Sequence, residues 1–267
     1  MNLLYCGNEK VYDGMMISLL SIIRHTKKKL QVFVITLDLH EKNPSYLPIS
    51  KQQTDNLQAM IQEVNKNSRI IRCDITEMFK KDMNESPNIG SSYTPYTLLR
   101  LYADLIEEIP DRILYLDTDT IAADSIEPLF DTDLTQYEMA GVIDYLGKWF
   151  IDIHYMNAGV LYLNMEMIRR TGLFEKARNL CITKKMWFPD QSALNRLAEK
   201  KLFISTQYNE QRRLRKNTVI QHFCKSIRWF PFFHTVNIKP WEIEKMHSIY
   251  KLTAYDSILE EYRRRKA

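Results

Sequence analysis

Short apolar runs alternate with longer amphipathic segments over the first two-thirds of the chain. The apolar runs predict strands at residues 3–6, 32–35, 69–73 and 112–116. The amphipathic segments between them predict helices at residues 14–24, 52–65 and 95–108. Three such alternations are typical of an α/β fold with a mostly parallel central sheet, helices on both faces, and ligands beyond the carboxyl ends of the strands.

The pattern becomes less regular after the fourth strand. Further strands are predicted at residues 139–143 and 159–163, and further helices at 166–181 and 191–200. We expect one α/β domain over residues 1–245, followed by a helical basic tail over residues 246–267.

Charge and cysteine content narrow the class of protein. The 37 basic and 33 acidic residues give a net charge of +4, too weak to indicate nucleic acid as a partner. The four cysteines are widely spaced and form no C-x-x-C pair, which is typical of reduced thiols.

No apolar run approaches the ~18 residues of a membrane span, and no signal peptide is predicted. We therefore expect a cytoplasmic protein, whose basic end from Arg263 to Lys266 can contact the anionic inner membrane surface peripherally.

An acidic triplet, Asp117-Thr118-Asp119, directly follows the predicted strand at residues 112–116. Two carboxylates separated by one residue on such a turn can converge on one hard cation through their oxygens. A cation held there would neutralise a diphosphate. The triplet is therefore the first candidate for a metal site.

Three interpretations of the triplet compete. It is the metal-binding D-x-D of a nucleotide-sugar transferase, the first motif of a haloacid-dehalogenase-like phosphatase, or a turn whose Asp side chains cap backbone amides. A phosphatase of this kind carries its nucleophile after the first strand and an acidic pair late in the chain. Here the first strand ends in Cys6-Gly7-Asn8, and no acidic pair of the D-D or G-D-x-x-x-D kind follows Asp119, which disfavours the phosphatase.

Five further features accompany the triplet in a fixed order along the chain. They are Arg100 before the triplet, Asp144 at the end of the next strand, Asn157-Ala158-Gly159-Val160, the pair Asp190-Gln191, and His222. Together they resemble glycosyltransferase family 8, over about residues 1 to 245. The resemblance implies a Rossmann-like nucleotide-diphospho-sugar transferase fold of the GT-A type. It also implies retaining transfer of a hexose, glucose or galactose, from a UDP-sugar to a glycan or glycolipid acceptor.

The resemblance also assigns roles to these residues. Asp117, Asp119 and His222 are expected to bind Mn²⁺ or Mg²⁺, with His234, before Lys239-Pro240-Trp241, as the alternative histidine. The residues expected to line the donor-sugar pocket are Arg100, Asp144, Asn157, Asp190 and Gln191. Asp190 and Gln191 are also the candidates for the catalytic nucleophile or for the group that stabilises the oxocarbenium ion.

The nucleotide is expected at the end of the first strand and beside the triplet. Cys6, Asn8, Tyr12 and Thr118 are its candidate contacts, although the family often places the stacking tyrosine where this chain has Val11. The cation that reaches the diphosphate is Lys225, Arg228 or Lys239, and the sequence does not choose among them.

The acceptor is the least defined partner. The aromatic segments at residues 145–155 and 229–233 are candidates for its entrance. A non-catalytic nucleotide-sugar-binding protein on the same fold remains a further alternative, because fold alone does not establish activity.

Overall fold

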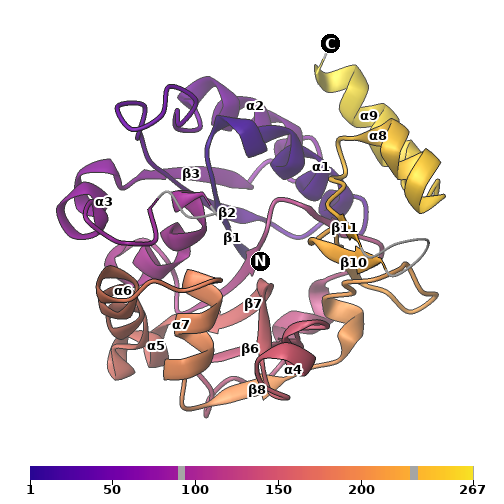
Figure 1. The fold of residues 1–267 in the computed structure, drawn as a ribbon. Coiled ribbons are helices and arrows are strands. Elements are labelled where there is room, and N and C mark those ends of the chain that lie inside the picture. Colours follow the sequence, from indigo (N-terminus) through magenta and orange to yellow (C-terminus); the bar gives the residue numbers. More distant parts are fainter. Residues whose placement is uncertain (90–93, 229–233, 267) are drawn as a thin grey trace.

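The computed structural model describes residues 1–89, 94–228 and 234–266. The described residues form a central seven-stranded sheet in the order β3-β2-β1-β4-β7-β6-β8 (Figure 1). Its strands are β1 (Asn2–Cys6), β2 (Gln31–Thr36), β3 (Arg69–Asp74), β4 (Arg112–Leu116), β6 (Met139–Ile143), β7 (Met156–Asn164) and β8 (Lys201–Phe203). The first four run parallel, β7 is antiparallel to both β4 and β6, and β8 is parallel to β6.

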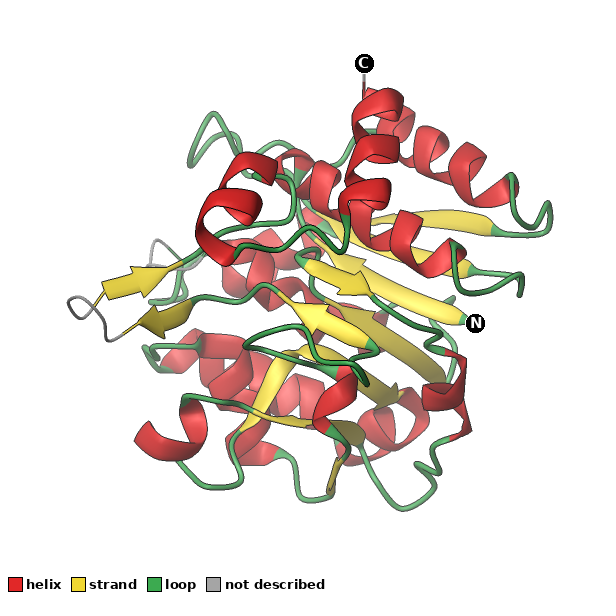
Figure 2. Cartoon of the chain, turned by 90° about the vertical axis from the view of Figure 1, so that its right-hand side faces the viewer, coloured by secondary structure: helices red, strands yellow, loops and turns green. Residues whose placement is uncertain are grey.

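Helices cover both faces of this sheet (Figure 2). The longer ones are α1 (Tyr12–Ile23), α2 (Lys51–Gln62), α3 (Thr76–Met83), η2 (Pro95–Leu105), α5 (Met165–Thr171), α6 (Leu173–Thr183), α7 (Pro189–Leu197) and α9 (Asp256–Lys266). The shorter ones are η1 (Glu9–Val11), η3 (Glu127–Asp131), α4 (Gly147–Phe150), η4 (Thr206–Tyr208), α8 (Ile243–Lys245) and η5 (Met246–Tyr250).

Each central strand contributes to two hydrophobic cores because successive side chains point to opposite faces. Leu114 and Leu116 of β4 pack into the core with α1, α2 and α9, whereas Ile113 and Tyr115 pack into the core with η2, α6 and α7. Apolar residues at every position are therefore required in these strands, which explains their continuous apolar pattern. The predicted α/β fold with helices on both faces is confirmed.

Two small antiparallel pairs lie beside the sheet. One joins β5 (Thr120–Ala122) to β9 (Ile220–His222), and it sets Thr120 opposite His222. The other joins β10 (Ser226–Arg228) to β11 (His234–Val236) and stands out from the rest of the chain in Figure 2. The first pair matters for the site, because it brings a distant segment to the end of β4.

The C-terminal helix α9 packs against α1. Its side chains Ile258, Leu259 and Tyr262 are buried in the same core as α1. The Arg24 guanidinium on the turn after α1 lies 2.9 Å from the Glu261 carboxylate. The end of the described chain is thus part of the α/β core.

Some predicted elements differ in detail. The helix expected at residues 95–108 is a 3₁₀ helix that ends at Leu105, and α3 was not predicted because only Phe79 and Met83 of its eight residues are buried. The helix expected at 166–181 is divided at Gly172, whose φ of 66° is a left-handed conformation that glycine adopts without steric cost. Within the described residues, none of the helices has the length and apolar content to cross a membrane.

Candidate active site

The acidic turn lies at the carboxyl end of β4 and is held from three sides. The Asp117 N–H donates to the Gly159 carbonyl on β7 at 2.7 Å. Thr120 Oγ1 donates to the Asp117 carbonyl at 2.8 Å and closes the turn on itself. Gly14 of α1 packs so closely that an added Cβ would lie 2.5 Å from the Thr118 carbonyl oxygen. A fixed backbone therefore presents both carboxylates.

His222 of β9 completes a three-residue group, Asp117, Asp119 and His222, which we name the acidic cluster. His222 Nε2 lies 3.6 Å from Asp117 Oδ2 and 3.3 Å from Asp119 Oδ1. One ligand atom from each residue lies within 4.8 Å of the others. Two carboxylate oxygens and one imidazole nitrogen form a donor set that fits Mn²⁺, and also Mg²⁺. The group is thus a candidate metal site.

The His222 ring lies directly over Gly159. A Cβ added to Gly159 would lie 2.1 Å from His222 Cε1, a distance that real side chains do not tolerate. The ring nitrogen Nδ1 is 3.2 Å from Asn209 Oδ1. These two neighbours fix the plane of the imidazole, so Nε2 faces the carboxylates.

Lys239 binds the acidic cluster from the outer side. Its Nζ lies 2.5 Å from Asp119 Oδ2 and donates to the Phe223 carbonyl at 3.1 Å. Burial opposes ionisation of Asp119, but Lys239 and His222 hold the pKa of its carboxyl well below the ordinary value. Burial likewise opposes protonation of His222, but Asp119 and Asp117 raise the pKa of the imidazole above its ordinary value. Opposite charges therefore stabilise one another in this buried group.

Arg100 is buried and links the acidic cluster to Asp190. Its guanidinium lies 3.1 Å from Asp117 Oδ1 and 3.1 Å from Asp190 Oδ2, and it also donates to the Ala158 carbonyl. The guanidinium stacks 4.0 Å from the ring centroid of Tyr115, whose hydroxyl donates to Asp117 Oδ1 at 2.6 Å. Arg100 is therefore a buried support of two carboxylates and not a solvated helix residue.

The structure brings Asp144, Asn157 and Gln191 into one network. Asp144 Oδ2 accepts from Asn157 Nδ2 at 2.8 Å and from Gln191 Nε2 at 3.2 Å. Asn157 Oδ1 accepts from Asn209 Nδ2 at 2.9 Å, and Asn209 in turn contacts His222. The predicted sugar-binding residues are thus joined to the acidic cluster through Asn209.

The candidate nucleotide contacts lie near the end of β1. Cys6 and Asn8 are buried, and burial raises the pKa of the Cys6 thiol. Thr118 is buried beside Gly14, whereas Tyr12 packs partly buried against the core that contains α1. Because β1 and β4 are adjacent and parallel, Cys6 and Asp117 lie at the same edge of the sheet.

Among the three basic candidates, Lys239 contacts the acidic cluster directly. Lys225 is exposed between β9 and β10. The side chains of Arg228 and of the alternative ligand His234 lie outside the described residues, as does the aromatic segment 229–233.

Comparison with known proteins identifies the family. The family model described as Glycosyl transferase family 8 matches residues 2–244. The chain belongs to glycosyltransferase family 8. The resemblance predicted from the ordered motifs is confirmed, and the match extends over almost the whole predicted 1–245 region.

Relatives in family 8 share part of their length with this chain. The Streptococcus pneumoniae glycosyltransferase GlyA is 32% identical over 159 residues, which are 56% of this chain and 22% of GlyA. The Escherichia coli lipopolysaccharide 1,2-glucosyltransferase is 27% identical over 202 residues, 70% of this chain and 56% of that enzyme. A Haemophilus influenzae relative is 22% identical over 228 residues, and 63% of its length is covered. The chain thus spans less than two-thirds of each of these relatives.

Solved structures in the comparison confirm the GT-A fold. The galactosyltransferase LgtC in complex with donor and acceptor sugar analogs has a TM-score of 0.69 and 18% identity. The similarity covers 99% of this chain and 100% of that chain.

Three residues that contact the predicted site residues in the structure were not predicted, or not chosen, from the sequence. Tyr115 is hidden within an apolar strand pattern, and Asn209 belongs to no recognisable motif. Lys239 was one of three basic candidates, among which the sequence did not choose.

Proposed function

We propose that the chain is a retaining glycosyltransferase that moves glucose or galactose from a UDP-sugar to a glycan or glycolipid acceptor, with Mn²⁺ or Mg²⁺. The acidic cluster carries this proposal, because its three ligand atoms lie within 4.8 Å beside Lys239. Its neighbours Asp144, Asn157 and Gln191 add hydroxyl-binding groups next to it. A nucleotide diphosphate and a sugar need these two kinds of group side by side.

Asp117, Asp119 and His222 would hold the metal ion. When bound, it would neutralise the charge that develops on the leaving diphosphate as the anomeric bond breaks. Lys239 is anchored to Asp119 and supplies a second positive charge that needs no reorganisation during the reaction. Arg100 and Tyr115 keep Asp117 in place through two bonds to the same oxygen, Oδ1.

Asp190 and Gln191 are the proposed catalytic residues on the sugar side. Burial raises the pKa of the Asp190 carboxyl, whereas Arg100 at 3.1 Å favours the carboxylate, so Arg100 would support a negative charge of Asp190 beside the sugar. The amide of Gln191 is bound to Asp144 and to the Ala158 N–H, and an amide is a poor nucleophile. We therefore favour attack from the same face as the leaving group, in which a donor phosphate oxygen takes the proton of the acceptor hydroxyl.

Relatives support transfer of a hexose. The Escherichia coli relative is named a lipopolysaccharide glucosyltransferase, and the similar LgtC is a galactosyltransferase. We propose the same class of donor here, with the nucleotide contacting Cys6, Asn8, Tyr12 and Thr118.

We further propose that residues 1–245 carry the transfer activity and that residues 246–267 are a helical basic tail, whose helix α9 packs on α1. In this tail, Arg265 Nη2 lies 2.6 Å from Glu63 Oε2, and Lys266 Nζ lies 2.6 Å from Asp13 Oδ2. Arg263 and Arg264 are exposed and remain the candidates for peripheral contact with an anionic membrane.

The test is a donor panel with UDP-glucose and UDP-galactose, each with and without Mn²⁺, in which release of UDP is measured. Mn²⁺-stimulated release from one of them is the expected result. Hydrolysis of simple phosphate esters without such release would support the phosphatase instead. UDP-sugar binding without turnover on any acceptor or on water would support a non-catalytic binding protein.

A further inference from the structure

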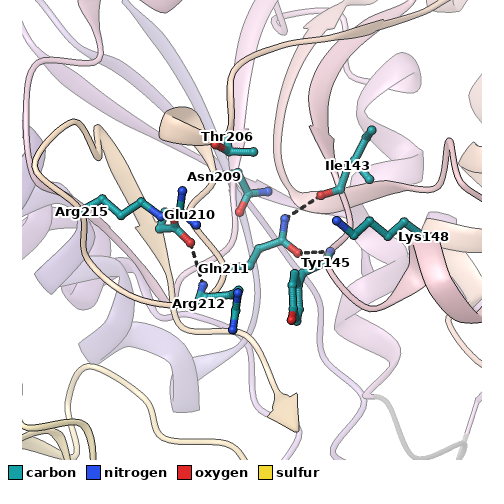
Figure 3. Close-up of a pocket in the computed structure, with 9 residues that line it drawn as sticks. All are labelled: Ile143, Tyr145, Lys148, Thr206, Asn209, Glu210, Gln211, Arg212 and Arg215. Atoms are coloured by element: carbon teal, nitrogen blue, oxygen red, sulfur yellow. Dashed lines mark hydrogen bonds and ion pairs between the residues drawn. The ribbon is translucent and has the colours of Figure 1, made fainter.

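Figure 3 shows the residues that line a pocket of about 310 Å³, which we name the basic pocket. One wall is the connection from β6 into α4, with Tyr145 and Lys148, and the other is the segment from Asn209 to Arg215. Gln211 joins the two walls, because its Nε2 donates to the Ile143 carbonyl at 3.0 Å and its Oε1 accepts from the Tyr145 N–H at 2.8 Å. The pocket is thus a built feature and not a gap between loops.

The basic pocket adjoins the proposed reaction site. Asp144 stands between the two residues whose backbone groups bind Gln211. Asn209 lines the pocket, and its side chain also contacts Asn157 and His222 at 2.9 and 3.2 Å. A group held in the pocket would lie next to the sugar-binding network and one residue away from the acidic cluster.

The pocket wall has an excess of positive charge. Among the described lining residues, Glu210 is the one carboxylate, and its Oε2 lies 2.9 Å from Arg215 Nε. Lys148 and Arg212 therefore remain without a carboxylate partner in this lining. Both cations lie over aromatic rings. Arg212 Cζ is 4.4 Å from the Tyr145 centroid, and Lys148 Nζ is 5.5 Å from the Tyr145 centroid and 5.3 Å from that of Trp149.

The entrance is basic as well. The exposed segment after Gln211 contains four basic residues in five positions, Arg212, Arg213, Arg215 and Lys216. Such a concentration of one sign raises the local concentration of anions and steers them toward the pocket. Because the segment from Arg212 to Lys216 lies beside the proposed reaction site, an anion that it attracts would be brought close to the sugar-binding residues.

We propose that the basic pocket binds a phosphate group of the acceptor, so that the acceptor is a phosphorylated saccharide. This inference rests on the proposed transferase function. The forked donors of Arg212 match phosphate oxygens, and Lys148 adds a point charge. Tyr145 positions Arg212, and Tyr145 with Trp149 positions Lys148, before the ligand arrives, which reduces the side-chain ordering that binding requires. The donor diphosphate has its own partners in the acidic cluster and Lys239, so the two phosphate sites are separate.

The experiment uses the full chain saturated with UDP and Mn²⁺, which fills the donor site. Glucose 6-phosphate and glucose are titrated in parallel, and their affinities are measured by ligand-observed NMR. We expect glucose 6-phosphate to bind at least about tenfold more tightly, because one charge-assisted hydrogen bond changes affinity by that factor or more. Equal affinity for the two probes would overturn the proposal.

Variants locate the phosphate. The double variant Lys148→Ala with Arg212→Ala is expected to lose the preference for glucose 6-phosphate. The control Arg69→Ala, which removes an exposed arginine of β3 at the far edge of the sheet, is expected to keep it. Affinity for UDP is expected to stay unchanged in all of them, which reports an intact fold and donor site. A preference that survives the double variant, or that exists only without UDP, would place the phosphate elsewhere.

Two further experiments distinguish this proposal from binding of a lipid headgroup and from the transferase function itself. Vesicles of phosphatidylglycerol test a lipid headgroup as the phosphate source, and Arg212-dependent binding of vesicles without binding of glucose 6-phosphate would overturn the saccharide proposal. Mn²⁺-stimulated UDP release from UDP-hexoses tests the transferase function independently. Release without a phosphate preference would reject the basic pocket proposal alone.

Discussion

The acidic cluster and the basic pocket meet at Asn209, yet they are built in opposite ways. In the acidic cluster, His222 and Asp119 are buried and each charge has an opposite charge within 4 Å. In the basic pocket, Lys148 and Arg212 lie over an aromatic ring and Arg212 is exposed. The charges of His222 and Asp119 in the acidic cluster are buried and paired, as expected for residues that bind the same diphosphate in every donor. The cations of the basic pocket lack carboxylate partners in its lining, so substitutions there could change which acceptor binds without disturbing the fold.

Among the variants considered, Asp119→Ala is expected to have the largest effect, because it disrupts the acidic cluster and leaves the basic pocket unchanged. It removes one carboxylate of the acidic cluster and leaves Lys239 and His222 without their main partner. We expect the rate of UDP release to fall by about 10²–10³, as for the loss of one preorganised electrostatic contact in an active site. Asp55→Ala on the exposed side of α2 is the control and keeps the wild-type rate. A rate within a factor of ten of wild type for Asp119→Ala contradicts the role of the acidic cluster.

Gly159→Ala perturbs the acidic cluster without changing any charge. The new methyl group would lie 2.1 Å from His222 Cε1, so the imidazole has to move. We expect the Mn²⁺ concentration needed for half-maximal activity to rise roughly 10–100-fold, the usual effect of losing the support of a metal ligand. Excess Mn²⁺ is expected to restore most of the rate. An unchanged Mn²⁺ requirement would exclude His222 as a ligand.

Asn209→Ala tests the residue that the two regions share. Its amide contacts His222 on one side and Asn157 on the other, and it also lines the basic pocket. We expect Mn²⁺ affinity to fall on the order of tenfold, because His222 keeps its glycine neighbour but loses its amide partner. The measurement is Mn²⁺ titration of UDP release. If only binding of glucose 6-phosphate changes, Asn209 supports the basic pocket and not the metal ligand.

Salt gives the smallest but most selective effect. From about 0.01 M to about 1 M salt the Debye length falls from about 30 to 3 Å, so exposed charges are screened much more than buried ones. We expect glucose 6-phosphate binding to weaken severalfold over this range, and Mn²⁺-dependent UDP binding to weaken less. Equal salt dependence of the two would mean that both regions are similarly exposed to solvent.

The sequence predicted the central sheet and its acidic turn because both follow from local patterns. Apolar runs mark β1 to β4, and the Asp117-Thr118-Asp119 triplet directly follows one of them. The ordered motifs then indicated the family, since their residue types and their order along the chain can be read without the structure. The ion pairs of Arg100 with Asp117 and Asp190 were not predicted, because they depend on how η2 packs under the sheet.

The residues that the sequence could not identify depend on contacts between distant segments. Asn209 reaches His222 because the segment after η4 runs beside β9, with the Glu210 N–H bonded to the Ile220 carbonyl at 2.9 Å. No periodicity reports such a pairing. The basic pocket likewise requires Gln211 to meet Ile143, 68 positions earlier in the chain. The contacts of Asn209 and Gln211 depend on which distant segments the fold brings together, so residue type alone could not predict them.

The packing of α9 on α1 has a consequence for synthesis of the protein. The core beside α1 contains Leu3 at one end of the chain and Tyr262 at the other. While the ribosome is still translating, the face of α1 that α9 covers stays in water, since residues 256–266 have not yet emerged. That uncovered apolar face is a site for chaperone binding or aggregation of the nascent chain. A chain truncated before residue 256 would keep this exposure permanently, although every residue of the acidic cluster and the basic pocket would be present.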